Sequence, residues 1–342
     1  MIFNLFITSI LIFYLFAINY FFKKFNIGLD VETDEEKHKS LLRSNNLTPL
    51  SGTLYFLPVV IILFYHLNYF LIICCSLLFI LGFCSDLKII TSYKKRLIIQ
   101  FFLISTLFLL NEEILINTRM DFIDHLMNFN LIRILLCTFF FMVLINGYNL
   151  IDGTNCLSSL NFLVVTIFII LIINNLNIEY VNKELSTLMI ALLIFLIFNF
   201  FGKNFLGDGA VYGLSFLLGY ILLEISLKNY SISPYFIANL LWYPAFENLF
   251  SILRRSLSKK NNYLADNDHL HHLIFKFYKK KEIIKKDILI SSLIGIFINF
   301  ILLINYFVGY TYYNHSWIQI ILILGGIILY LLSYYSLQKR LS

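Results

Sequence analysis

Residues 157 to 174 read LSSLNFLVVTIFIILIIN, an apolar stretch without a charged side chain. A helix of about 20 such residues crosses a bilayer, because each backbone amide finds its hydrogen-bond partner inside the segment. The chain holds ten more stretches that are mostly apolar. The eleven candidate spans cover residues 2 to 22, 50 to 69, 70 to 86, 97 to 111, 130 to 148, 157 to 174, 185 to 200, 210 to 227, 233 to 253, 288 to 307 and 315 to 337. We therefore expect an all-α integral membrane protein of about eleven transmembrane helices, or ten or twelve, since only Asn68 separates the second span from the third.

The composition of the whole chain agrees with this prediction. Of its 342 residues, 59% are apolar and 13% are charged, against about 25% charged residues in soluble proteins. Five cysteines lie in or beside apolar runs at no regular interval, which indicates neither a disulfide framework nor a CxxC metal site; they are Cys74, Cys75, Cys84, Cys137 and Cys156. We expect a single polytopic domain over residues 1 to 342.

Lys and Arg predict the orientation, because basic loops are retained on the cytoplasmic side of a membrane. With the N-terminus outside and the C-terminus inside, the cytoplasmic segments carry 22 of the 26 basic residues. These segments are 23–49, 87–96, 201–209, 254–287 and 338–342, and 149–156 is a further cytoplasmic connection. The first span lacks a basic leader and a cleavage site, so we expect it to remain as an anchor. The net charge of +6 then reflects topology and anionic lipid headgroups, and does not indicate nucleic-acid binding.

Four polar patches fall on the predicted cytoplasmic side. They are Gly82–Asp86 (GFCSD), Asn146–Asn155 (NGYNLIDGTN), Lys203–Gly209 (KNFLGDG) and, in the loop 254–287, Asp266–His272 (DNDHLHH). A single Asp-Gly pair after a helix is usually a turn with a helix cap. However, the coincidence of all four on one face favours a functional site, because ionisable residues at membrane depth are unfavourable and tend to be functional.

The side chains in these patches suit a phosphate-rich substrate. Asp86, Asp152 and Asp208 offer the oxygen ligands that Mg²⁺ prefers, typically one or two carboxylates together with substrate phosphates. Lys203, Arg96, Arg254 and Arg255 supply positive charge for diphosphate oxygens. His269, His271 and His272 can bind phosphate or transfer protons. Zinc binding by these histidines is an alternative, which the lack of a nearby thiolate and the basic loop disfavour.

In order along the chain, the motifs are Gly82-x-x-Ser85-Asp86, Asn146-x-x-Asn149-Leu-x-Asp152-Gly153, Lys203-x-Phe205-x-Gly207-Asp208 and His269-Leu-His271-His272. This series resembles the polyprenyl-phosphate N-acetylhexosamine-1-phosphate transferases. That family includes bacterial undecaprenyl-phosphate GlcNAc-1-phosphate transferases and phospho-MurNAc-pentapeptide transferases. The resemblance runs from about Asp30 to His272. It includes Pro244-x-x-Glu247 and Arg254-Arg255, where Glu247 and Arg254 share one helix face.

The resemblance implies transfer of an N-acetylhexosamine 1-phosphate from a UDP-sugar to undecaprenyl phosphate, with release of UMP. This reaction would start a lipid-linked glycan on the cytoplasmic face of the bacterial inner membrane. Mg²⁺, or alternatively Mn²⁺, would be the cofactor, and a homodimer is one expected assembly. By position, Asp208 and Asp152 would hold the metal and Asp86 would complete the catalytic carboxylates. The substrate-binding residues would be His38, Arg96, Asn149, Asn155, Lys203, Arg254, Arg255, His269, His271 and His272.

The chain departs from the family pattern at several positions. Ser85 stands where the family has the first Asp of a pair, and Cys156 and Ala210 replace glycines. A phosphate monoester is already largely ionised at pH 7, so we expect activity without a carboxylate base at position 85. The alternative is a degenerate paralogue that binds polyprenyl phosphate without catalysis. The His-Leu-His-His form is closer to the GlcNAc-type enzymes than to the pentapeptide transferases.

A secondary transporter for an anionic solute is a rival interpretation. Transporters gather polar residues and broken helices at the midplane, often in two repeated halves. Here the helix interiors are almost free of charge, and the sequence has no internal repeat. Formation of a lipid-linked sugar separates an enzyme from a transporter or a scaffold.

Overall fold

A computed structural model describes residues 2–30, 48–111, 118–178, 181–257, 268–282, 284 and 286–341. This part of the chain forms thirteen helices and one two-stranded sheet. The helices are α1 (Ile2–Phe25), α3 (Gly52–Phe64), α4 (Tyr69–Asp86), α5 (Tyr93–Leu110), α6 (Asp121–Met127), α7 (Asn130–Ile151), α8 (Leu157–Asn175), α9 (Asn182–Phe200), α10 (Gly207–Lys228), α11 (Pro234–Leu257), α12 (Leu270–Lys280), α13 (Asp287–Thr311) and α14 (Ser316–Leu341). Strand β1 (Leu29–Asp30) pairs antiparallel with β2 (Thr48–Pro49).

Each of the eleven predicted spans lies largely within one helix of the structure. Eight of these helices are long and apolar enough to cross a membrane by length and composition: α1, α4, α7, α8, α9, α10, α13 and α14. Helix α3 is shorter, with 13 residues, and α5 begins with the cations Lys94, Lys95 and Arg96. The chain is therefore an all-helical integral membrane protein, and eight rather than eleven helices meet the criteria for a span on their own.

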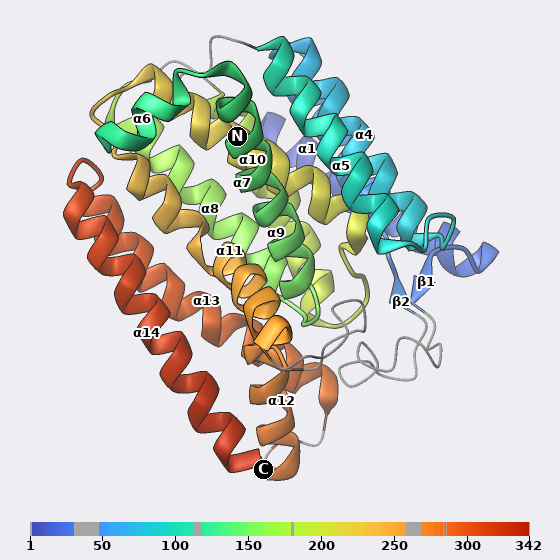
Figure 1. Ribbon diagram of the computed structural model, residues 1–342. Coiled ribbons are helices and arrows are strands. Elements are labelled where there is room, and N and C mark those ends of the chain that lie inside the picture. Colours follow the sequence, from blue (N-terminus) through green and yellow to red (C-terminus); the bar gives the residue numbers. More distant parts are fainter. Residues whose placement is uncertain are drawn as a thin grey trace.

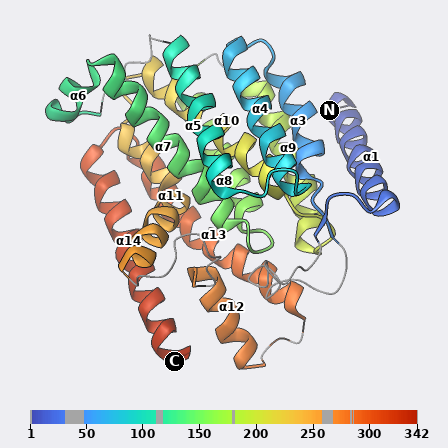
Figure 2. The ribbon, with the colours of Figure 1, turned by 45° about the vertical axis from the view of Figure 1, so that its right-hand side comes forward.

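The two remaining helices lie in segments that the sequence predicts as loops. Helix α6 falls in a predicted outer segment and α12 in the predicted cytoplasmic loop 254–287. Figures 1 and 2 show α6 at one end of the bundle and α12 with the C-terminus at the other end. The N-terminus lies toward the end with α6 (Figure 1). The termini thus lie toward opposite ends of the bundle.

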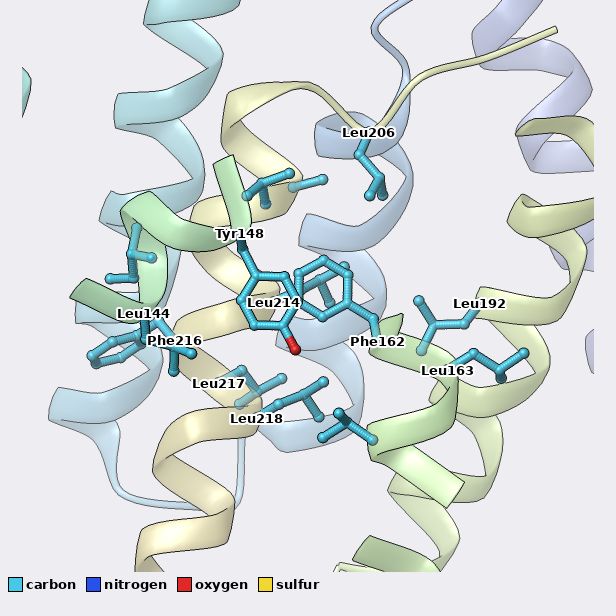
Figure 3. Packing of buried hydrophobic residues seen from close by; sticks show 14 of the residues in the cluster. Leu144, Tyr148, Phe162, Leu163, Leu192, Leu206, Leu214, Phe216, Leu217 and Leu218 are labelled. Atoms are coloured by element: carbon cyan, nitrogen blue, oxygen red, sulfur yellow. The ribbon is translucent and has the colours of Figure 1, made fainter. Parts of the chain in front are cut away.

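Helix α10 runs through the middle of the bundle and is buried along most of its length. Small residues allow this close packing. A Cβ atom at Gly82 of α4 would lie 2.4 Å from the backbone of Gly209 in the first turn of α10. Below that turn, Leu214, Leu217 and Leu218 of α10 pack beside the stacked rings of Tyr148 and Phe162, whose centroids are 4.3 Å apart (Figure 3). The core therefore fixes the start of α10 against its neighbours.

Candidate active site

Asp208 lies in the first turn of α10, where side chains from three other helices meet its carboxylate. Oδ2 of Asp208 accepts hydrogen bonds from Arg96 Nη1 of α5 at 2.5 Å and from Ser85 Oγ of α4 at 2.7 Å. Oδ1 accepts one from Asn149 Nδ2 of α7 at 2.7 Å. Tyr212 is one turn further along α10, and its hydroxyl lies 3.3 Å from Arg96 Nη1. The first three polar patches of the sequence thus meet at one carboxylate.

Asp86 contacts the backbone of the same turn. Its Oδ1 accepts from the N–H of Asp208 at 2.8 Å, and its Oδ2 accepts from the N–H of Gly209 at 3.3 Å. A carboxylate is favourable at a helix N-terminus, where the backbone N–H groups lack partners within the helix. Gly207 has a φ of +77°, and a Cβ there would lie 2.6 Å from Asp86 Oδ2. The structure therefore gives Asp86 a capping contact that holds Asp208 in place.

The turn after α7 joins the second patch to the histidines. Asp152 caps the C-terminal end of α7, three residues after Asn149, and it accepts a hydrogen bond from Ser158 Oγ. A Cβ at Gly153 would lie 3.1 Å from Nε2 of both His271 and His272. The absence of a side chain at position 153 therefore lets two imidazole rings approach the end of α7.

Asn155 and Cys156 connect this turn to the helices behind it. The N–H of Asn155 donates to Ser291 Oγ of α13 at 2.9 Å, and the Asn155 side chain is buried. Cys156 has a φ of +63°, in the left-handed region that favours glycine. Its N–H donates to Asn199 Oδ1 of α9 at 2.7 Å. This bond helps to hold a residue with a side chain in a conformation that glycine adopts more readily.

The three histidines form a buried cluster at the start of α12. The rings of His269 and His271 are nearly parallel with centroids 5.6 Å apart, and those of His271 and His272 are 4.3 Å apart. His269 Nδ1 lies 2.8 Å from Glu247 Oε1 of α11. Within the described residues, neither ring nitrogen of His271 has a hydrogen-bond partner. Burial, and next the charges of His272 and His269, lower the pKa of His271 well below its usual 6.5.

The arginines that the sequence predicts as substrate-binding residues have different neighbours. Arg254 Nη1 donates to the carbonyl oxygen of Asp268, next to the histidines, and to the hydroxyl of Tyr334 at 2.7 Å. Burial raises the pKa of Tyr93, and the charges of Arg255 and Arg96 act against this rise. Arg255 and Arg96 thus both lie close enough to Tyr93 for their charges to act on its hydroxyl group.

Lys203 is exposed, and its ammonium lies over the ring of Phe201, 5.8 Å from the centroid. The structure therefore does not bring Lys203 into hydrogen-bonding contact with Asp208. The predicted substrate residue His38 lies outside the described residues.

Sequence reasoning missed some residues of this region. Tyr212 could have been found, because it follows Asp208 by one helical turn and so shares its face. Tyr330 and Tyr334 of α14 contact Glu247 and Arg254 through their hydroxyls. They give no sequence signal, since tyrosines in an apolar helix are indistinguishable from packing residues.

The donor set around Asp208 can be compared with the needs of a metal ion. Over the part of the chain that is described, no group of three or more His, Cys, Asp or Glu could hold a metal. A magnesium site does not need such a group, because Mg²⁺ takes one or two carboxylates and completes its shell with water and phosphate. Asp208 and Ser85 present oxygen atoms side by side, whereas Asn149 turns its amide nitrogen toward Asp208, so the carboxylate and the hydroxyl fit Mg²⁺ bound together with substrate phosphates. Oδ2 of Asp208 already accepts a hydrogen bond from Arg96. A metal ion bound to the same oxygen would compete with that bond.

Comparison with known protein families gives one match. The model described as glycosyl transferase family 4 matches residues 48–226, just over half of the chain. The matched segment covers α3 to α9 and most of α10, and therefore Ser85, Arg96, Asn149 and Asp208. No match was found among curated proteins.

Proposed function

The chain belongs to glycosyl transferase family 4, whose members transfer a sugar 1-phosphate to a polyprenyl phosphate, and we propose that it uses a UDP-N-acetylhexosamine and undecaprenyl phosphate. UMP would be the second product. The observation that carries the proposal is the meeting of Ser85, Arg96 and Asn149 at the carboxylate of Asp208. These residues come from three helices and lie 123, 112 and 59 residues before Asp208 in the sequence, so folding brings them to one turn of a fourth helix.

The reaction is a phosphoryl transfer, in which positioning and charge stabilisation provide most of the catalysis. An oxygen of the lipid phosphate attacks the phosphorus that carries the sugar. The bond from that phosphorus to the oxygen shared with UMP breaks, and UMP leaves with the electron pair. Because the attacking phosphate monoester is already ionised near pH 7, Ser85 is not required to remove a proton.

Asp208 and Asp152 would hold Mg²⁺, or Mn²⁺ in its place, and Asn149, which donates to Asp208, would bind the nucleotide sugar. When bound, the ion would neutralise charge on the diphosphate. Asp86 serves this arrangement through the backbone of Asp208 and Gly209, because it caps the turn that carries the central carboxylate.

Arg96 fixes the orientation of Asp208. Its Nε is buried without a hydrogen-bond partner among the described residues, which supports a role for Arg96 toward a phosphate oxygen. Arg254 and Arg255 would add charge near the same end of the bundle, and His269, His271 and His272 would line the sugar-diphosphate pocket. His38, Asn155 and Lys203 remain proposals as further substrate-binding residues.

The side of the membrane follows from charge and substrate. The helix ends that carry the site lie at the end of the bundle with α12 and the C-terminus (Figure 2), and the predicted cytoplasmic segments hold 22 of 26 basic residues. We place this end on the cytoplasmic face of a bacterial inner membrane. The water-soluble UDP-sugar would reach the site from the cytoplasm. A homodimer is the assembly that we propose.

A panel assay tests the proposed function. Purified protein is incubated with polyprenyl phosphate, Mg²⁺ and either UDP-GlcNAc, UDP-GalNAc or UDP-glucose, and the lipid product is identified by mass. We expect a polyprenyl diphosphate N-acetylhexosamine, formed neither with EDTA nor by Asp208→Asn. Absence of a lipid-linked sugar with every donor, from a folded protein that binds polyprenyl phosphate, would indicate the degenerate paralogue instead.

A further inference from the structure

Two polar contacts join α11 to α14 beside the histidine cluster. In the first, the hydroxyl of Tyr330 donates to Glu247 Oε2 at 2.8 Å, while Glu247 Oε1 faces His269 Nδ1, also at 2.8 Å. In the second, Arg254 Nη1 donates to the hydroxyl of Tyr334 at 2.7 Å and to the carbonyl oxygen of Asp268. The first contact holds the ring of His269, and the second holds the backbone of Asp268, the residue just before it.

The spacing of these residues follows from helix geometry. Glu247 and Arg254 are seven residues apart on α11, and Tyr330 and Tyr334 are four apart on α14, so each pair lies on one helix face. Helix α14 is otherwise mostly open to the surroundings. Its buried residues are Gln319, Tyr330 and Tyr334. In its C-terminal half, the buried residues of α14 are thus the two tyrosines that contact α11.

We propose that Glu247 and Tyr330, supported by Arg254 and Tyr334, form a clamp that positions His269 and fixes which of its ring nitrogens faces the substrate. This inference rests on the proposed function, because the substrate that His269 meets is the UDP-sugar. It makes the last helix of the chain part of the site. Neither α14 nor α11 lies in the segment that the family model matches.

The choice of ring nitrogen follows from hydrogen-bond chemistry. A carboxylate accepts hydrogen bonds and cannot donate them, so His269 must carry a proton on Nδ1 to bond Glu247. A neutral imidazole has one N–H, which leaves Nε2 as an acceptor. Nε2 is then suited to a hydroxyl or amide N–H of the sugar. Glu247 and Tyr330 act through His269 and are positioning residues, as carboxylates that orient histidines are at metal sites.

Stability alone is a weak explanation for the clamp. The side chain of Glu247 is 1% exposed, and burying a carboxylate is unfavourable unless it is fully hydrogen bonded. Replacing buried ionic groups with apolar residues of similar size is often neutral or stabilising. Orientation of His269 explains why a carboxylate is buried at this position, whereas packing alone does not.

Nuclear magnetic resonance of the full chain, labelled with ¹⁵N at histidine, measures the ring directly. The His269 signals are identified by their loss in His269→Gln. We expect Nδ1 protonated and Nε2 unprotonated in the wild type. Glu247→Leu removes the acceptor, so signal should shift toward the Nε2–H form. Glu247→Gln keeps an acceptor oxygen and should preserve the wild-type pattern.

Kinetics test the consequence for the reaction. Tyr330→Phe and Glu247→Leu should lower kcat about 10- to 100-fold, the usual effect of losing a partner of a functional histidine. Tyr335→Phe is the matched control, since this tyrosine lies on the same helix but is exposed, and it should leave kcat unchanged. If Glu247→Leu does not fold, Tyr330→Phe carries the kinetic test, and the protonation of Nδ1 in the wild type carries the structural one.

The outcomes are separable from those of the proposed function. Unchanged His269 signals in Glu247→Leu, or wild-type kcat in Tyr330→Phe, would overturn the clamp even in an active transferase. If the wild type makes no lipid-linked sugar but the His269 signals shift as expected in Glu247→Leu, the clamp stands and the proposed function is refuted.

Discussion

Replacing Arg96 by Gln should destabilise the protein because it leaves Asp208 without its positive partner. The two side chains are 19% and 12% exposed, and the charged atoms are 2.5 Å apart. Removing one partner of a buried ion pair destabilises a protein by about 3–5 kcal/mol, and a hydrogen bond to a charged group contributes about 1.5–3 kcal/mol. Because Asp208 keeps its bonds to Ser85 and Asn149, we expect a loss of about 2–3 kcal/mol.

A double-mutant cycle isolates this pair. Asp208→Asn alone leaves Arg96 without its carboxylate, whereas the double variant leaves no unpaired charge, so the coupling energy should be about 2 kcal/mol. Unfolding in mixed micelles, titrated with dodecyl sulfate, gives the four free energies. The control is the Glu224–Lys228 pair, which is 2.8 Å long but 27% and 49% exposed, and should show a coupling below about 0.5 kcal/mol. A coupling below that limit for Arg96 and Asp208 would refute the ion pair as an organising contact.

Three more predictions concern the same region. Asp208→Asn should stay folded while its UMP release falls at least about 100-fold; turnover near the wild-type rate would contradict its role. Gly82→Ala places a Cβ 2.4 Å from the backbone of Gly209, so it should push α10 away and lower both melting temperature and kcat, whereas Gly325→Ala, with nothing within 4 Å, should change neither. Burial lowers the pKa of His271, so the unfolded chain takes up a proton below pH 6.5 that the folded protein does not. The free energy of unfolding should then fall by up to about 1.4 kcal/mol per pH unit as the pH drops below 6.5. His271→Asn should flatten this slope, and equal slopes would contradict the assignment.

The helical fold could be predicted because hydrophobic stretches in a bilayer have few alternatives to a helix. The limits of such prediction appear at α12. Its sequence LHHLIFKFYKK is short and half polar, and a short segment of this kind becomes helical through tertiary packing rather than through intrinsic propensity. Packing of α12 against α14 and α13 cannot be derived from local pattern.

The site was partly predictable for a similar reason. Asp208 and Asn149 belong to polar patches that stand out against apolar helices, and Arg96 lies in the basic segment after the first patch, so their residue types and shared face suggested a common site. The individual contacts were not predictable. That Asp86 caps the backbone of Asp208 depends on how closely α4 packs on α10.

The fate of the β-phosphate of the nucleotide sugar tests the central claim most directly. The purified protein is given polyprenyl phosphate and a UDP-N-acetylhexosamine labelled with ³²P at that phosphate. Transfer of sugar 1-phosphate predicts that the label enters the lipid fraction with an equal amount of UMP. Label that stays in water as UDP while the sugar enters the lipid fraction would contradict the account.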